Sequence, residues 1–339
     1  MLSSIILIEY RYHILSVFFK NSNGLKKSIL IMASIGIVGA GLFGIYHFKK
    51  DSSDGRAFIW KVTTEIMADA PVFGVDFDRF KANYMNYQAD YFEKNGETPE
   101  ALVADNTYYA FNEWLQYAVE NGLTGGVFLA LFLYALFKVN VDKKEQFMVA
   151  ISFSGLLAIS GFALFSYPMQ ILPIKMIIVI LLGFLSVLDR RKYKILNIQN
   201  KPHIPVFFKA TVFILGTIGI VKGVEYANSL DRGFETWQNA LNKYRYGDYD
   251  GALEDYAKAY PVFRKEGDFL MNYGKALSIA EQYGKAVGIL EEAKQHLNTT
   301  IIETALGDAY KGLKQYDKAE TAYYHAVTIL SIVFTSKTL

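Results

Sequence analysis

The chain has 339 residues, of which 52% are hydrophobic and 20% charged, with a mean hydropathy of +0.16 and a formal net charge of +2. This composition is more apolar than that of a soluble domain and indicates membrane spans, while the small net charge argues against a nucleic-acid-binding protein. The absence of cysteine excludes disulfides and cysteine nucleophiles, and no two of the five histidines have a metal-ligand spacing, so we expect no metal site.

Five apolar runs are each close to the ~20 residues that cross a bilayer core as a helix. They cover residues 28–46, 123–137, 147–165, 170–188 and 206–224. Each run is expected to be helical, because lipid offers no hydrogen-bond partner to free backbone groups. A sixth run, residues 2–19, is interrupted by charges and is interpreted as the remains of a span or as a surface helix. The sequence therefore predicts an all-α, polytopic helical membrane protein with about five spans.

The distribution of lysine and arginine predicts the orientation. Basic clusters precede the first run, follow the second, and follow the fourth at residues 189–194, so all three fall on one side if every run crosses. This agrees with the positive-inside rule. The other side then receives the loop at residues 49–122, the short turn at Tyr167 and Pro168, and everything after the last run. That loop holds seven basic and thirteen acidic residues, a net charge of −6, which the rule allows to be translocated.

The loop is predicted to form three helices. The first opens at Gly55–Arg56 and ends at Pro71 and Gly74, because proline and glycine interrupt a helix. The second covers residues 77–92 and has aromatic side chains three and four positions apart. The third covers residues 106–121 and continues through a glycine-rich stretch into the second span.

The C-terminal part of the chain contains a repeat. The anchors Tyr249–Ala252, Tyr283–Ala286 and Tyr316–Ala319 recur at offsets of 34 and 33 residues, which is the tetratricopeptide period. These observations predict four segments: an N-terminal segment with the first span (1–48), the loop (49–122), four spans (123–224) and a helical repeat solenoid (225–339). The solenoid is either a spacer or a docking surface for a protein partner, and both interpretations stay open.

Four short motifs occur in the loop in a fixed order. They are a Gly-Arg-x₃-Trp helix, a Pro-x-x-Gly turn, an Asn-Glu-x-Leu helix and a Gly-x-x-Gly entry to a span, found at residues 55–60, 71–74, 112–115 and 122–125. In this order, and with repeats at the C-terminus, the chain resembles the O-antigen ligase and polymerase superfamily, in the branch that carries tetratricopeptide repeats. The resemblance is close over residues 49–136.

The resemblance implies glycosyl transfer at the periplasmic face of a bacterial inner membrane. The donor would be an undecaprenyl-diphosphate-linked glycan, the acceptor lipid A core or another glycan, and neither a metal nor a nucleotide cofactor would take part. Among the loop residues, Arg56 matches the family arginine that holds the donor diphosphate, and a guanidinium fork suits that task. Trp60, Tyr109 and Asn112 complete the predicted substrate-binding set. An alternative role for Arg56 is to anchor a helix start at the headgroup level.

The chain departs from the family pattern where a histidine is expected to act as the base. Phe111 precedes Asn112 at that place, and the loop contains no histidine. Glu113 and Asp105 are the carboxylates that could act instead, although a solvated helix-surface carboxylate is the commoner role for such residues. We therefore name them as candidate catalytic residues.

A second family arginine has Arg11 as its only candidate here, and one clear span precedes the loop where relatives have many. These differences suggest a truncated or split member. The competing hypothesis is a non-catalytic, membrane-anchored scaffold that presents its repeats to cell-envelope partners. The aromatic side chains of the second loop helix could stack on sugars or rest in the interfacial layer of the membrane, but we favour packing between the loop helices.

Overall fold

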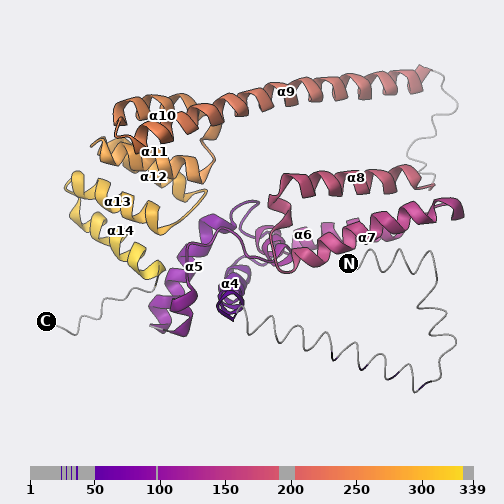
Figure 1. The fold of residues 1–339 in the computed structure, drawn as a ribbon, viewed down its shortest axis with the longest axis horizontal. Helices are drawn as coiled ribbons and strands as arrows, with labels where there is room; N and C mark the ends of the chain where they lie inside the picture. The colour runs from indigo at the N-terminus through magenta and orange to yellow at the C-terminus, as the bar shows by residue number, and fades with distance from the viewer. Residues whose placement is uncertain are drawn as a thin grey trace. The chain divides into compact units, whose positions relative to one another are not determined.

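A computed structural model of the chain describes residues 50–96, 98–190 and 203–330, together with the isolated positions 24, 28, 32 and 36 (Figure 1). Every regular element in these ranges is a helix, which confirms the all-α prediction. The chain divides into two compact units, residues 1–191 and 192–339. The run at residues 2–19 and Arg11 lie outside the described residues, and so does the predicted first span apart from positions 28, 32 and 36.

Three helices form the loop. They are α4 (Lys50–Asp69), α5 (Phe80–Asn95) and α6 (Glu113–Phe137), with a short 3₁₀ turn, η1 (Pro99–Val103), between the last two. α4 buries Phe58, Val62 and Ile66, which are spaced four residues apart and so lie on one helix face. Burial of these side chains against α5 and α6 holds the loop helices together by the hydrophobic effect.

The aromatic side chains of α5 form the core of this loop. Phe80, Tyr84 and Tyr91 are at most 5% exposed, and the Phe58 ring lies 5.2 Å from that of Tyr91, centroid to centroid. Burial raises the pKa of the Tyr84 hydroxyl far above its ordinary value. Packing between the loop helices, the interpretation favoured over sugar stacking in the sequence analysis, thus accounts for the burial of these three rings.

Two predicted helix starts are corrected. α5 begins at Phe80 instead of residue 77, because Asp76 and Asp78 have positive φ angles of 75° and 59° and cannot continue a helix. The third loop helix begins at Glu113 instead of residue 106, because Phe111 has a φ of +50° and Asn112 has extended backbone angles. Residues 104–112 therefore form an ordered connection without helix.

Apolar helices follow the loop. α6 continues into the run at residues 123–137, and α7 (Gln146–Ala163) and α8 (Leu172–Leu188) come next, preceded by the short turns η2 (Lys143–Glu145) and η3 (Pro168–Gln170). α6, α7 and residues 210–245 are long and apolar enough to cross a membrane, whereas α8 is apolar but has 17 residues. These helices make the chain an integral membrane protein.

The ends of α6, α7 and α8 meet in pairs. Arg190, just after α8, forms an ion pair with Asp142, just after α6, and the Arg190 backbone N donates to the Asn140 carbonyl over 2.8 Å. At the opposite end, the Met169 backbone N donates to the Glu113 carboxylate over 2.9 Å. Arg190, the last described residue of the cluster at residues 189–194, thus lies at the same end of these helices as the connection that holds Asn140 and Asp142. The side of the membrane on which this end lies stays a prediction.

The second unit is built on a single long helix, α9 (His203–Arg245), which passes through the predicted domain boundary at 224/225 without a break. Five further helices follow it: α10 (Tyr249–Phe263), α11 (Gly267–Ile279), α12 (Tyr283–Lys294), α13 (Thr300–Gly312) and α14 (Tyr316–Ile329). They pack as the pairs α9/α10, α11/α12 and α13/α14. The three pairs match the predicted repeat period, while their identity as tetratricopeptide repeats stays a prediction.

Candidate functional site

Two glycines in left-handed conformations join the turn after α4 to the middle of α6. Gly74, after α4, has a φ of +72°, and Gly122, inside α6, has a φ of +57°. Their backbones touch: a Cβ atom on Gly122 would lie 2.6 Å from the Gly74 N and from the Val72 C and O atoms. The Leu123 and Thr124 amides donate to the carbonyls of Pro71 and Val72 over 2.9 and 3.1 Å. The Pro-x-x-Gly and Gly-x-x-Gly motifs are therefore the two halves of one backbone contact.

A buried polar chain extends this contact towards residues 108–112. The Gln116 side chain accepts a hydrogen bond from the Ala110 N over 3.1 Å and donates one to the Glu120 carboxylate over 3.1 Å. Glu120 also accepts hydrogen bonds from the backbone of Asp78 and Phe80. Because Gln116 and Glu120 are each 6% exposed, their hydrogen bonds fix the segment before α6 and the turn before α5 relative to each other.

Arg56 lies beside the position where the family motif has histidine. Its guanidinium carbon is 5.5 Å from the centre of the Phe111 ring, a cation–π contact between α4 and the segment before α6. Phe111 holds a positive φ that bulky residues rarely adopt, and such strain often marks a functional site. The structure thus brings together two motif positions that are 55 residues apart in the sequence.

Arg56 differs from Lys61, further along α4, in its partners. Among the described ion pairs none involves Arg56, and its side chain is half-buried. Lys61, in contrast, donates to the Tyr91 hydroxyl over 2.9 Å and lies 3.6 Å from a Glu100 carboxylate oxygen. The hydrogen bond to Tyr91, helped by Glu100, raises the pKa of Lys61 above its ordinary value.

Trp60 and Asn112 hold the site in place. The Trp60 indole Nε1 donates to the Ala110 carbonyl over 2.9 Å, which ties α4 to the segment before α6. The Asn112 Oδ1 accepts from the backbone amides of Trp114 and Leu115, each over 3.1 Å, and so caps the N-terminus of α6. A substrate-binding role for these two residues stays a prediction, but both have a structural role that the sequence analysis missed.

The turn between α7 and α8 supplies a wall of the site. Tyr167 stacks on Tyr109, with ring centroids 4.8 Å apart and an interplanar angle of 23°, and meets the Phe111 ring edge-on at 5.4 Å. Two residues before Tyr167, the Phe165 ring lies 6.5 Å from the Trp60 ring, centroid to centroid. Tyr167 was not predicted as a site residue. The signal for it was the topology, which already placed this turn on the same side as the loop.

The two candidate bases differ in their surroundings. Glu113 is half-buried at the first position of α6, where the Met169 amide donates to its Oε1. Asp105 is exposed, and its Oδ1 accepts from the neighbouring Asn106 amide over 2.7 Å. Glu113 is two residues from Phe111, which contacts Arg56, whereas Asp105 is six residues from Phe111. No group of three potential metal-ligating side chains occurs in the described residues.

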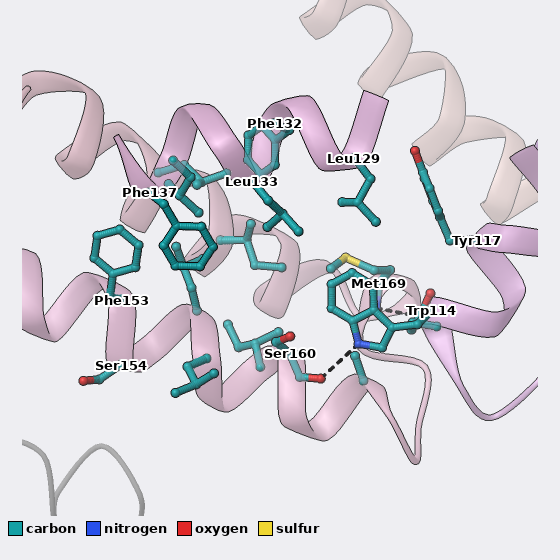
Figure 2. A pocket seen from close by; sticks show the side chains of 18 of the residues that line it. Trp114, Tyr117, Leu129, Phe132, Leu133, Phe137, Phe153, Ser154, Ser160 and Met169 are labelled. Carbon is teal, nitrogen blue, oxygen red and sulfur yellow. Dashed lines mark hydrogen bonds between the residues drawn. The ribbon is translucent and has the colours of Figure 1, made fainter. Parts of the chain in front are cut away.

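An apolar groove of about 700 Å³ begins beside Glu113 and extends between α6, α7 and α8. Figure 2 shows Trp114, Tyr117 and Met169 at one end of it and Phe137 and Phe153 at the other. The Trp114 indole donates to the Ser160 carbonyl over 3.3 Å, which places its polar edge on α7 (Figure 2). The groove thus has an aromatic, partly polar end next to the loop and an apolar interior between the candidate spans.

A family model described as O-antigen ligase matches residues 11–130 of the chain. The match covers the loop and the beginning of α6, including Arg56, Phe111 and Glu113, and it supports the resemblance noted from the motifs. No curated protein matches the chain.

Proposed function

We propose that the chain takes part in glycosyl transfer from an undecaprenyl-diphosphate-linked glycan to a glycan acceptor, in the manner of O-antigen ligases. The observation that carries the proposal is the contact between Arg56 and Phe111, beside the start of α6, in the segment that matches the ligase family. In this contact, Arg56 matches the family's phosphate-binding arginine and Phe111 occupies the position of the family's base. The site lies in the periplasm in this proposal, since the basic ends of α6 and α8 are opposite to it.

The groove suits the lipid part of such a donor. Its lining is almost entirely apolar, so an isoprenoid chain could lie between α6, α7 and α8 with its diphosphate at the end next to Glu113. Arg56 then grips the diphosphate with two parallel N–H donors and neutralises the charge that develops on it as the leaving group.

The reaction requires one proton acceptor. An acceptor hydroxyl attacks the anomeric carbon of the first sugar, the bond from that carbon to the diphosphate oxygen breaks, and undecaprenyl diphosphate leaves with the bonding electrons. The hydroxyl proton passes to a carboxylate, and we assign this role to Glu113, whose Oε1 accepts a hydrogen bond from the Met169 amide. Its Oε2 would take the proton. Asp105 is the second choice, because it is exposed and already bound to its neighbour.

Substitution of Arg56 tests this proposal. Arg56→Ala should lower glycan transfer by about a hundredfold or more, and Arg56→Lys should be a poor substitute because it lacks the fork. Arg79→Ala is the matched control, since Arg79 is another half-buried loop arginine without a motif counterpart. Transfer is measured in cells that depend on the introduced gene, with membrane insertion checked in parallel. If Arg56→Ala transfers glycan as well as Arg79→Ala does, the diphosphate role is wrong.

A membrane-anchored scaffold is the second candidate function. It is favoured by a hollow of about 260 Å³ between α11 and α13, lined by Lys275, Thr304 and Asp308 among others, which could receive a segment of a protein partner. This function requires neither Arg56 nor Glu113. It would take first place if the Arg56 variants retained full activity in the cell.

A further inference from the structure

We infer that Tyr109, Phe111 and Tyr167, hereafter the aromatic cluster, form the subsite for the first sugar of the lipid-linked glycan. The inference rests on the proposed function and adds to it a position for the sugar and a residue, Tyr167, that lies beyond the segment matching the ligase family. The three rings come from two separate segments, the connection before α6 and the turn between α7 and α8.

The rings of the cluster are more accessible than those of the loop core. Tyr109, Phe111 and Tyr167 are half-buried, whereas Phe80 and Tyr84 are at most 1% exposed. Partial exposure of three rings in contact leaves aromatic surface on which a ligand can lie.

The position of the cluster relative to Arg56 fits a sugar diphosphate. Phe111 touches both partners, with the Arg56 guanidinium carbon 5.5 Å and the Tyr167 ring 5.4 Å from its own ring centre. In a glycosyl diphosphate the first sugar ring is bonded directly to a phosphate oxygen. If Arg56 holds the phosphate, the sugar bonded to it would lie over the neighbouring rings of Phe111 and Tyr167.

The chemistry of the rings matches this ligand. A pyranose has a polar rim of hydroxyls and flatter faces of C–H groups, and the C–H faces stack on aromatic rings, while tyrosine hydroxyls can hydrogen-bond the rim. Such a contact also orients the anomeric carbon towards the acceptor, and orientation is a large part of what an enzyme supplies to a two-substrate reaction.

Tyr167 provides the sharpest test, because it belongs to none of the loop motifs. The full chain in lipid nanodiscs is titrated with two probes, undecaprenyl diphosphate and undecaprenyl diphosphate carrying one N-acetylglucosamine. The wild type should bind the glycosylated probe about threefold to tenfold more tightly, as expected of one aromatic contact. Tyr167→Ala should abolish this difference without changing the Kd of the sugar-free probe, whereas Tyr167→Phe should preserve it.

Phe165→Ala is the control for a merely structural effect, since Phe165 is on the same turn and contacts Trp60 instead of the cluster. If Tyr167→Ala and Phe165→Ala weaken both probes equally, or if Tyr167→Ala preserves the difference, the sugar subsite is wrong. If the wild type binds both probes equally and Arg56→Ala weakens both, the subsite is wrong while the proposed function stands. If neither probe binds the wild type, the proposed function itself fails.

Discussion

Replacing Gly122 by alanine tests whether the contact between the two glycine motifs holds the loop on the spans. Gly122 has φ 57° and ψ −158°, a conformation close to one that essentially glycine alone adopts, so alanine there costs about 1–3 kcal/mol in backbone strain. The added Cβ would also lie 2.6 Å from three backbone atoms of residues 72 and 74, and such overpacking costs typically another 1–3 kcal/mol. We therefore expect the contact to weaken by roughly 2–6 kcal/mol.

Hydrogen exchange measures this loss where it occurs. The amides of Val75, Leu123 and Thr124 donate across the contact, so peptides covering residues 71–75 and 119–124 should exchange at least about 30-fold faster in Gly122→Ala, the equivalent of 2 kcal/mol. Gly126→Ala is the matched control, because Gly126 lies in the same helix with nothing within 4 Å of its added Cβ. Alanine there favours the helix. Equal exchange in the two variants would refute the reasoning.

Three further predictions follow from other parts of the structure. Asn112→Ala should destabilise the start of α6 by about 0.5–2 kcal/mol, seen as faster exchange of the Trp114 and Leu115 amides, because the cap is lost. The unit of residues 192–339 should lose stability as the pH falls below about 4.5. Burial alone would raise the pKa of the Glu303 carboxyl, but Lys294 and His325 together have the larger effect and lower it. Glu303→Gln should make the melting temperature less dependent on pH in this acid range. A cysteine at position 53 should react with an impermeant maleimide in intact cells and one at position 197 should not; the reverse pattern would invert the topology.

The acid prediction for Glu303 depends on the direction of its shift. Glu303 is 2% exposed, with Lys294 Nζ and His325 Nδ1 at 2.7 and 2.9 Å from its Oε1. A carboxyl group whose pKa is lower in the folded state stabilises the fold above its unfolded pKa, and this stabilisation disappears as the pH falls through the folded value. An unchanged melting temperature of the wild type across that acid range would contradict the assignment.

Local patterns were sufficient to predict the helical class and the approximate extent of the loop helices. The spacing of Ile59, Val62, Ile66 and Ala70 predicts a helix with one apolar face. The structure buries Val62 and Ile66 and leaves Ile59 and Ala70 half-buried. The late start of α6 could also have been found from the sequence, because Asn112 followed by an acidic residue is typical of a helix N-terminus.

The geometry of the site could not be predicted in the same way. The positive φ of Phe111 has no local signal, since neither glycine nor proline is near, and distant hydrogen bonds from Trp60 and to Gln116 fix the adjoining Ala110. The contact of Tyr167 with Tyr109 joins segments 58 residues apart. Only tertiary packing brings such residues together, and a single sequence carries no record of that packing.

α9 is one continuous, rigid helix on which the second unit is built. At 1.5 Å per residue its 43 residues extend roughly 65 Å, about twice the thickness of the hydrocarbon core of a bilayer. The apolar run ends at residue 224, and α9 meets α10 near Gly233 and Trp237, where both pack on Phe263. About ten helical residues, roughly 15 Å, thus separate the end of the predicted last span from the contact with α10. A force applied to the repeats would therefore tilt or rotate the last span directly, because no flexible hinge exists between them to absorb it.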